Sequence, residues 1–383
     1  MRKLHIGLVA PEFPPAMGGL QTYGWELACA LAELGHAVEV FVGKNTWDGR
    51  PTPFVVRPIL DLRARTDGPA LRAVPVDVWH GTNAACAWLG NVMTAPIFVT
   101  VAGNDLLSPY LPFGRLDLRT RFRLPFGSRL DHWLGRQLTV RLMRRGFPRV
   151  AGVFAISRTI RTLAIERYSL IPDRVHLVPP AASATFTSQP PRHASEPKVR
   201  QVISVCRLSE PRKNIDGVLR ALAQLPADLP PWRYVVVGDG ILRGFLEALA
   251  TSLGIADRVE FTGSLPTPDL IDRLRASDLF VLPSRTDSTS IEGFGIVYLE
   301  AAACGVPSIA AAGGGADDAI EPGESGWILP DPEPATIAAQ LEKCLRGTAA
   351  ISPEKCQQHA RRFSWLTSAG RMVERYQAAL AST

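Results

Sequence analysis

The chain has 383 residues, of which 46% are apolar and 20% charged, and its formal net charge is +6. This length is enough for two domains that each bury a core of their own. Because no run of about 18 apolar residues and no cleavable signal at the N-terminus is present, we expect a cytoplasmic protein. The six cysteines are scattered without a C-x2-C pair, which argues against a zinc site or a disulfide framework.

Strand-length apolar runs alternate with amphipathic segments in the first half, the pattern of a parallel sheet covered on both faces. A helix is expected at 21–34, closed by Gly35, and Ser157 is expected to cap a later helix. We place the first domain at residues 1–182. Its expected strands are 4–10, 37–42, 76–79, 97–101 and 152–155.

Gly18 and Gly19 lie between the first expected strand and the first expected helix. Glycines let backbone amides approach a phosphate closely, and the N-terminus of the following helix is electropositive. A Gly-Gly pair is usually only a turn. Its position after the first strand nevertheless favours contact with a phosphate-bearing donor.

Basic residues concentrate in the first half of the chain. Residues 1–180 contain 22 Lys and Arg against 13 Asp and Glu, and ten arginines lie in 115–149 alone. Leucines at every fourth position from Leu130 to Leu142 form an apolar stripe beside these arginines. The segment could be a solvated face of a helix packed on its own domain, or it could contact an anionic membrane. Nucleic acid is disfavoured because no recognisable reader motif accompanies the charge.

Residues 183–200 are rich in Pro, Ser, Gln and Arg, have no periodic apolar pattern and are expected to be a linker. The alternation then restarts and predicts a second doubly wound domain at 201–362, followed by a last helical segment at 363–383. The strands expected in this domain are 202–206, 233–237, 258–262, 278–282 and 306–311. The run Gly313-Gly314-Gly315 is interpreted as structural, with Asp317 and Asp318 as charges at a helix start.

Arg207 and Lys213 follow the expected strand 202–206. Parallel sheets bind ligands at the carboxyl ends of their strands. Arg can grip phosphate oxygens with two hydrogen bonds, and Lys neutralises them as a point charge. Either residue alone could be an ordinary surface charge.

Glu292 and Glu300 are separated by eight positions around a predicted helix start. Eight helical residues rise by about 12 Å, so the two carboxylates could hold the ends of an elongated ligand whose anionic centre faces the helix N-terminus. A nucleotide diphosphate-sugar has that shape and charge. Ordinary helix capping would also select two glutamates near a helix start.

Taken in order, these motifs resemble family 4 of the retaining nucleotide-sugar glycosyltransferases, and the resemblance covers nearly the whole chain. The segments that carry it are Pro11 to Gln21, Val202 to Asn214, Val235 to Gly240, Ser284 to Glu300 and Ala303 to Pro307.

The resemblance implies an α/β protein of the GT-B fold, in which two doubly wound Rossmann-like domains face each other across a cleft. The first domain would bind the acceptor and the second the nucleotide-sugar, while the last helix would cross back to the first domain. The implied reaction moves a hexose or N-acetylhexosamine, with retention, to a hydroxyl of a glycan, lipid-linked or small-molecule acceptor. A role in making a surface polysaccharide, a glycolipid or a glycosylated metabolite would follow.

The resemblance also implies residue roles. Glu292, Arg207 and Lys213 would be the catalytic set, with Glu292 positioning the transferred sugar rather than acting as a base. No cofactor and no metal are expected, because the chain lacks an Asp-x-Asp motif. The implied donor-binding residues are Gly18, Gly19, Arg207, Lys213, Glu292, Gly293, Phe294, Gly295 and Glu300.

The chain departs from the family pattern after strand 97–101. Many members have a histidine where this chain has Ala102. Asn104, Asp105 or His80 could supply a replacement contact to the sugar or the acceptor. A lone histidine is, however, more often structural.

Two alternatives to a transferase remain open at this stage. A phosphorylase or a sugar-nucleotide epimerase of the same architecture would act without a separate hydroxyl acceptor. A catalytically silent sugar-nucleotide sensor would bind the donor without turnover. The residues do not identify the nucleotide base, the sugar, the acceptor or the oligomeric state.

Overall fold

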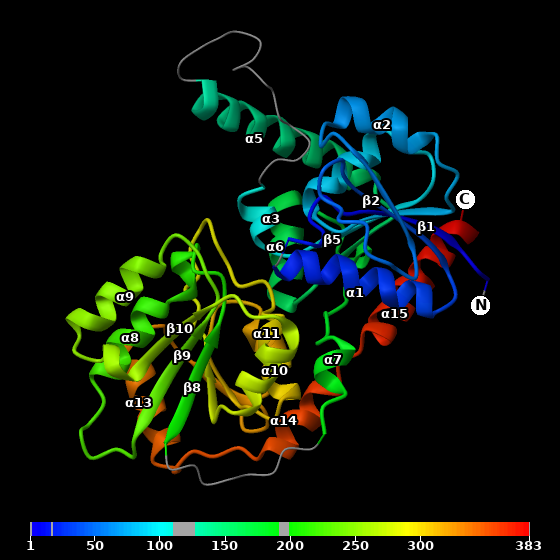
Figure 1. Ribbon diagram of the computed structural model, residues 1–383. Helices are drawn as coiled ribbons and strands as arrows, with labels where there is room; N and C mark the ends of the chain where they lie inside the picture. Colours follow the sequence, from blue (N-terminus) through cyan, green and yellow to red (C-terminus); the bar gives the residue numbers. More distant parts are fainter. Residues whose placement is uncertain (1, 17, 110–126, 191–198, 383) are drawn as a thin grey trace. The chain divides into compact units, whose positions relative to one another are not determined.

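The computed structural model describes residues 2–16, 18–109, 127–190 and 199–382, and these form two compact units, each built on one sheet (Figure 1). Unit 1 consists of residues 1–180 together with 365–383, and unit 2 of residues 181–364. The expected last helix therefore packs with the first half of the chain, although 184 residues separate it from the rest of unit 1.

The sheet of unit 1 has seven parallel strands in the order β3-β2-β1-β4-β5-β6-β7. The strands are β1 (His5–Val9), β2 (Ala37–Gly43), β3 (Val55–Leu60), β4 (Val78–Gly81), β5 (Ile97–Val101), β6 (Gly152–Ala155) and β7 (Val175–Leu177). Ile6 in β1 lies opposite both Val38 and Val78, and all three side chains are buried, as expected for a central strand covered on both faces.

The helices of unit 1 lie between these strands in the chain, except for the last one, which comes after unit 2. They are α1 (Gly19–Glu33), α2 (Ala64–Arg72), α3 (Asn104–Leu107), α5 (Gly127–Gly146), α6 (Arg158–Tyr168) and α15 (Trp365–Ala381), with 3-10 turns η1 (Ala84–Asn91), η2 (Phe147–Arg149) and η3 (Pro172–Arg174). Ser157 caps α6 as predicted, since its side chain accepts a hydrogen bond from the Ile160 amide. Within this unit α15, red in Figure 1, lies alongside α1.

The sheet of unit 2 has six parallel strands in the order β10-β9-β8-β11-β12-β13. The strands are β8 (Arg200–Val205), β9 (Trp232–Val237), β10 (Val259–Gly263), β11 (Leu279–Val281), β12 (Ser308–Ala311) and β13 (Gly326–Leu329). Its helices are α7 (Ala184–Thr187), α8 (Ile215–Ala223), α9 (Arg243–Ser252), α10 (Thr267–Arg275), α11 (Ile296–Ala303), α12 (Ala316–Ala319), α13 (Pro334–Leu345) and α14 (Pro353–Ala360), with 3-10 turns η4 (Pro211–Lys213) and η5 (Ala256–Arg258).

The predicted strands and the doubly wound class are confirmed, but three strands were not predicted. The β3 run is interrupted by Arg57 and Pro58, which an edge strand tolerates. β7 and β13 are only three and four residues long.

The expected linker was also partly wrong. Residues 184–187 form helix α7, which packs against α11 and buries Phe186. Residues 191–198 of that segment lie outside the described part of the chain.

Both sheets reverse their strand order once. In unit 1 the reversal lies between β1 and β4, and in unit 2 between β8 and β11. Loops that leave the carboxyl ends of such strand pairs diverge to opposite faces of the sheet and leave a crevice where open α/β sheets bind ligands. The two reversals therefore define where a site should be sought in each unit.

Candidate functional site

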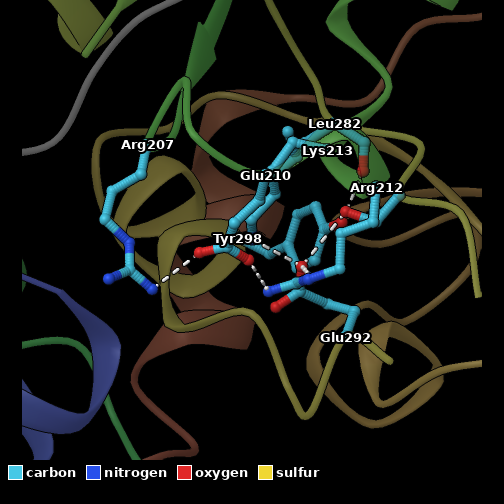
Figure 2. Close-up of polar contacts among 8 residues, drawn as sticks. Arg207, Glu210, Arg212, Lys213, Leu282, Glu292 and Tyr298 are labelled. Carbon is cyan, nitrogen blue, oxygen red and sulfur yellow. Dashed lines mark hydrogen bonds and ion pairs between the residues drawn. The ribbon is translucent and has the colours of Figure 1, made fainter. Parts of the chain in front are cut away.

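The predicted catalytic residues of unit 2 lie on the two loops that leave its strand-order reversal. Arg207 and Lys213 lie on the loop after β8, and Glu292 lies on the loop after β11. The polypeptide turns back through η4 at residues 211–213, which places Arg212 and Lys213 beside Glu292 (Figure 2). The reversal thus gathers a cluster of charged side chains at the edge where a ligand would bind.

Glu292 is the centre of this cluster. Its side chain is buried, and its Oε2 atom accepts hydrogen bonds from Arg212 Nη1 at 2.9 Å, Lys213 Nζ at 2.6 Å and Ser284 Oγ at 3.1 Å. A buried carboxylate requires such partners, because an isolated charge would lose its hydration without compensation. The pairing ties the loop after β11 to the loop after β8.

The two cations keep Glu292 ionised. Burial by itself would raise the pKa of the Glu292 carboxyl, but the charges of Lys213 and Arg212 outweigh it and lower that pKa to about 2. The carboxylate can therefore accept hydrogen bonds from a ligand at neutral pH, and it has no proton to donate. Its predicted role in positioning the transferred sugar stays a prediction.

Close backbone packing holds the Glu292 segment in place. The Gly315 amide donates to the Glu292 carbonyl oxygen at 2.7 Å, and a Cβ at Gly315 would lie 1.9 Å from the Gly293 oxygen. Gly314 and Gly315, from the run interpreted as structural, pack against this segment, and Asp317 and Asp318 lie in the first turn of α12. The glycines let two loops touch where side chains would separate them.

Helix α11 begins just beyond Glu292. Gly295 has φ 81° and ψ 67°, a left-handed conformation that favours glycine, and precedes the first helical residue Ile296. The Tyr298 hydroxyl donates to the Leu282 carbonyl oxygen at 2.6 Å, so the helix is fixed to the end of β11. The start of α11 presents free amide groups, as every helix N-terminus does, next to the cationic cluster.

The remaining donor-binding candidates of unit 2 differ in exposure. The Phe294 side chain is buried against Phe363, so only its backbone could meet a ligand. Gly293 is buried as well, and Gly295 is half-buried. Glu300 lies within α11, is half-buried and stays a candidate for the far end of an elongated ligand.

Arg207 makes a separate ion pair. Its Nη2 atom lies 2.6 Å from Glu210 Oε1, and the side chain is 59% exposed. The second oxygen of Glu210 lies 2.6 Å from Arg212 Nη2. Arg207, Glu210, Arg212, Glu292 and Lys213 therefore form a row of alternating charges (Figure 2).

A cavity of about 310 Å³ adjoins this row. It lies between the loop 207–213 and the starts of α8 and α9, and both Arg207 and Lys213 line it. Most of its other walls are apolar: Leu208, Pro211, Ile215, Leu242, Phe245 and Leu246. The two cations thus border a space that combines charge with apolar surface, as small-molecule sites do.

In unit 1 the glycine loop lies at the reversal between β1 and β4. Gly18 has φ 154° and ψ 169°, a conformation that only glycine adopts easily, and α1 begins at Gly19. Across the reversal, Asn83 Nδ2 donates to Glu12 Oε1 at 3.3 Å. The loop is thus placed where a ligand of unit 1 would bind, and its predicted contact with a phosphate stays a prediction.

His80 does not face a ligand, and this suggestion was wrong. Its side chain is fully buried, its Nδ1 lies 2.5 Å from the Tyr376 hydroxyl, and its Nε2 lies 2.8 Å from Thr100 Oγ1. Burial lowers the pKa of His80 to about 3, so the ring is neutral. His80 joins α15 to the sheet of unit 1.

Asp105 also has a structural task that conflicts with the predicted sugar contact. It is buried, and its carboxyl oxygens accept hydrogen bonds from the amides of Ala84 at 2.8 Å, Ala102 at 3.0 Å and Gly103 at 2.7 Å. Both oxygens are thereby used to shape the loop after β5. Asn104 is half-buried at the start of α3 and stays a candidate contact.

Three residues of the cluster were missed from the sequence: Glu210, Arg212 and Ser284. All three lie within the motif segments, Glu210 and Arg212 in Val202 to Asn214 and Ser284 at the start of Ser284 to Glu300. The signal in the sequence that could have found Arg212 is the dibasic pair before Asn214, a residue type that tolerates the left-handed conformation it adopts here, with φ 59°. Among the described residues no group of three or more His, Cys, Asp or Glu side chains is placed to hold a metal ion.

The predicted basic helix is α5. Trp133 is 58% exposed. Four arginines of this helix, and Arg149 in the adjoining turn η2, are exposed as well: Arg136, Arg141, Arg144 and Arg145. The opposite face packs on η1, where a Cβ at Gly146 would lie 1.8 Å from the Ala87 oxygen. Residues 115–126 of the predicted patch lie outside the described residues. No helix in the ranges that the structure describes is long and apolar enough to cross a membrane.

Family models match both halves of the chain. The model of glycosyl transferases group 1 matches residues 185–363, and that of Glycosyltransferase Family 4 matches residues 17–186. A D-inositol 3-phosphate glycosyltransferase of Thermobispora bispora is 31% identical over 95% of this chain and 90% of its own length. A GDP-mannose-dependent alpha-(1-6)-phosphatidylinositol monomannoside mannosyltransferase of Mycolicibacterium smegmatis is 27% identical over 96% and 97%.

Solved structures share the fold at low sequence identity. Sucrose-phosphate synthase of Thermosynechococcus elongatus superimposes with a TM-score of 0.74 at 20% identity over the whole of both chains. Anabaena HepE in complex with UDP has a TM-score of 0.72 at 18% identity, covering 98% of this chain and 100% of its own.

Proposed function

Because the chain belongs to glycosyltransferase family 4, we propose that it moves a hexose or an N-acetylhexosamine from a nucleotide diphosphate-sugar to an acceptor hydroxyl with retention at the anomeric carbon. The observation that carries this proposal is the buried Glu292 carboxylate held by Lys213 and Arg212 at the strand-order reversal of unit 2. It combines fixed cations for a diphosphate with an ionised acceptor for sugar hydroxyls.

The diphosphate would bind among Arg207, Lys213 and the amides at the start of α11. Breaking the bond between sugar and phosphate leaves negative charge on the diphosphate, so donors already aimed at that position lower the barrier. These groups supply the neutralising charge, and we therefore propose that the reaction needs no metal ion. The leaving phosphate would take the proton of the acceptor hydroxyl.

Glu292 would position the transferred sugar by accepting hydrogen bonds from its hydroxyls. Its low pKa keeps it charged at any pH at which the enzyme would work. Glu300, two helical turns further on, would hold the ribose. The anomeric carbon would then lie between Glu292, which holds the sugar, and the cations Arg207 and Lys213, which hold the diphosphate.

For the acceptor we propose a phosphorylated cyclitol or a lipid that carries one. This rests on the names of two relatives, a D-inositol 3-phosphate glycosyltransferase and an alpha-(1-6)-phosphatidylinositol monomannoside mannosyltransferase. The exposed arginines of α5 favour the lipid form, because an anionic membrane attracts basic segments. The protein would then be cytoplasmic and bind the inner face of the membrane peripherally.

The donor site is tested by thermal unfolding of the full chain with UDP-, GDP-, ADP- and TDP-sugars, using Lys213→Ala and, as a control, Lys343→Ala on the exposed face of α13. A donor at 100 times its Kd should stabilise the wild type by about 2.7 kcal/mol. We expect one nucleotide class to stabilise the wild type and the control but not Lys213→Ala. Stabilisation of all three proteins alike would remove Lys213 from the site.

The reaction itself is tested with inositol phosphate and phosphatidylinositol as acceptors in the presence of EDTA. We expect a product whose anomeric configuration, read by NMR, equals that of the donor. Inversion, or activity that EDTA abolishes, would refute the proposed chemistry.

The membrane contact is tested by sedimentation with phosphatidylcholine vesicles, with and without phosphatidylglycerol. Each arginine near an anionic surface contributes about 1 kcal/mol, so replacing Arg141, Arg144 and Arg145 by Gln should weaken binding about a hundredfold. The matched control replaces three exposed arginines elsewhere: Arg220, Arg233 and Arg371. If both variants lose vesicle binding equally, the net charge of the protein explains the binding, and α5 has no specific role in it.

A further inference from the structure

Glu210 forms an ion pair with Arg207, a cation that the proposed donor site needs to bind the diphosphate. Its Oε1 atom lies 2.6 Å from Arg207 Nη2, while its Oε2 atom lies 2.6 Å from Arg212 Nη2. The two carboxylate oxygens thus have separate partners, one at the border of the cavity and one inside the cluster (Figure 2). The side chain of Glu210 is 22% exposed, that of Arg207 59% and that of Arg212 11%.

The two pairs differ in how easily they open. The Arg207 pair is largely exposed, and exposed ion pairs contribute little to stability. The Arg212 pair is nearly buried, and Arg212 is in turn held by Glu292. An incoming anion could therefore displace Glu210 from Arg207 while Arg212 still anchors the carboxylate. The Arg207 guanidinium would then be free to turn toward that anion.

We propose that Glu210 is an internal counter-anion, which holds Arg207 in the absence of donor and yields it to the diphosphate when donor binds. The inference rests on the proposed function, since it assigns a regulatory residue to the same site. In the free protein, three cations and two carboxylates leave the row with a net charge of +1. Glu210 therefore sets how strongly the row attracts a diphosphate, and how readily it releases the nucleotide after transfer.

This role and a purely structural role predict opposite changes in donor affinity when Glu210 is replaced. If Glu210 only shaped the loop, its removal would loosen the site and weaken donor binding. If Glu210 competes with the diphosphate, replacing its charge by a neutral amide leaves two unbalanced cations and strengthens binding. The upper value for an exposed ion pair, about 1 kcal/mol, corresponds to an affinity change of about fivefold.

The test is calorimetric titration of the full chain with UDP and GDP, comparing wild type, Glu210→Gln and Glu210→Asp. The matched control is Glu247→Gln, because Glu247 pairs with Arg243 at 2.8 Å in the same unit but outside the row. Uridine and guanosine serve as ligands without a diphosphate. Circular dichroism of each variant, without ligand, checks that it is folded.

We expect Glu210→Gln to bind the preferred nucleoside diphosphate about fivefold more tightly than wild type, with a steeper dependence on salt. The nucleoside should bind all proteins equally, and both Glu210→Asp and the control should stay near the wild type. Unchanged or weaker diphosphate binding by a folded Glu210→Gln, or equally tightened nucleoside binding, would overturn the inference alone. Failure of the wild type to bind any nucleoside diphosphate would overturn the proposed function and the inference with it.

Discussion

Replacing Glu292 by Gln removes the charge of the central carboxylate while keeping its shape. The amide cannot neutralise Lys213 and Arg212, which lie 2.6 and 2.9 Å from Oε2. Arg212 then keeps its ion pair with Glu210, while Lys213 loses its ion pair with Glu292. The variant thus measures what the charge of Glu292 contributes to unit 2.

The size of the effect follows from the pKa of Glu292, which the cations lower from 4.5 to about 2. At 1.36 kcal/mol per pKa unit this difference corresponds to about 3 kcal/mol. Unit 2 spans 184 residues, and for a domain of that size 1 kcal/mol shifts Tm by about 2–4 °C. We expect Glu292→Gln to lower the Tm of unit 2 by about 6–12 °C at pH 7.

The pH dependence has a definite sign. Because the folded pKa is depressed, the contribution of Glu292 is complete above about 4.5 and is lost as pH falls toward about 2. The amide stands in for the protonated carboxyl, so the variant has nothing to lose over this range. The difference in Tm between wild type and variant should therefore be constant from pH 7 to 5 and narrow below pH 4.5.

The assay is differential scanning calorimetry at pH 7, 5 and 3.5, with the transition of unit 2 identified as the one that UDP or GDP shifts. Glu247→Gln, on the exposed face of α9, serves as the control and should change Tm by no more than about 2 °C. A Tm difference as large at pH 3.5 as at pH 7 would show that Glu292 acts by packing and not by charge.

Three further substitutions test the supports of the two sites. Gly315→Ala brings a Cβ within 1.9 Å of the Gly293 oxygen, so it should displace the adjacent loop and lower kcat/KM at least tenfold in a folded protein; full activity would mean that the loop yields freely. Asp105→Asn keeps one acceptor oxygen but replaces the other by an NH2 donor, so at least one buried amide loses its acceptor at a cost of about 1–3 kcal/mol, and the Tm of unit 1 should fall by about 2–12 °C; no fall would show that those hydrogen bonds are dispensable. Tyr376→Phe deprives His80 of a partner, so amide hydrogen exchange in α15 should accelerate, while unchanged exchange would show that apolar packing alone holds the helix.

The alternation of apolar runs was enough to predict two parallel sheets, because strands buried on both faces are apolar along their whole length. β3 escaped prediction because an edge strand can contain Arg57 and Pro58. Helix α7 escaped because one buried side chain, Phe186, stabilises four helical residues that have no periodicity. Short elements take their conformation from tertiary contacts, which a local pattern does not contain.

The site was predictable in its position but not in its pairings. Glu292 and Lys213 do meet, because parallel strands bring their carboxyl ends to one edge. Arg212, rather than Arg207, became the arginine partner of Glu292 because η4 and the left-handed Asn214 turn the dibasic pair inward. His80 directly follows the predicted strand 76–79, as a binding residue would, but in the structure it lies inside β4, fully buried, and contacts the hydroxyl of Tyr376, 296 residues further along the chain.

The insertion of Tyr376 between unit 1 side chains has a practical consequence for recombining this protein with its relatives. Its ring lies 4.9 Å from Phe98 and 6.0 Å from Phe154, centroid to centroid, so residues 365–383 complete the interior of the N-terminal half. A chimera that exchanges residues 1–180 alone would join a foreign sheet to this helix. To exchange unit 1 as a whole, both segments must come from the same parent, with junctions after residues 180 and 364.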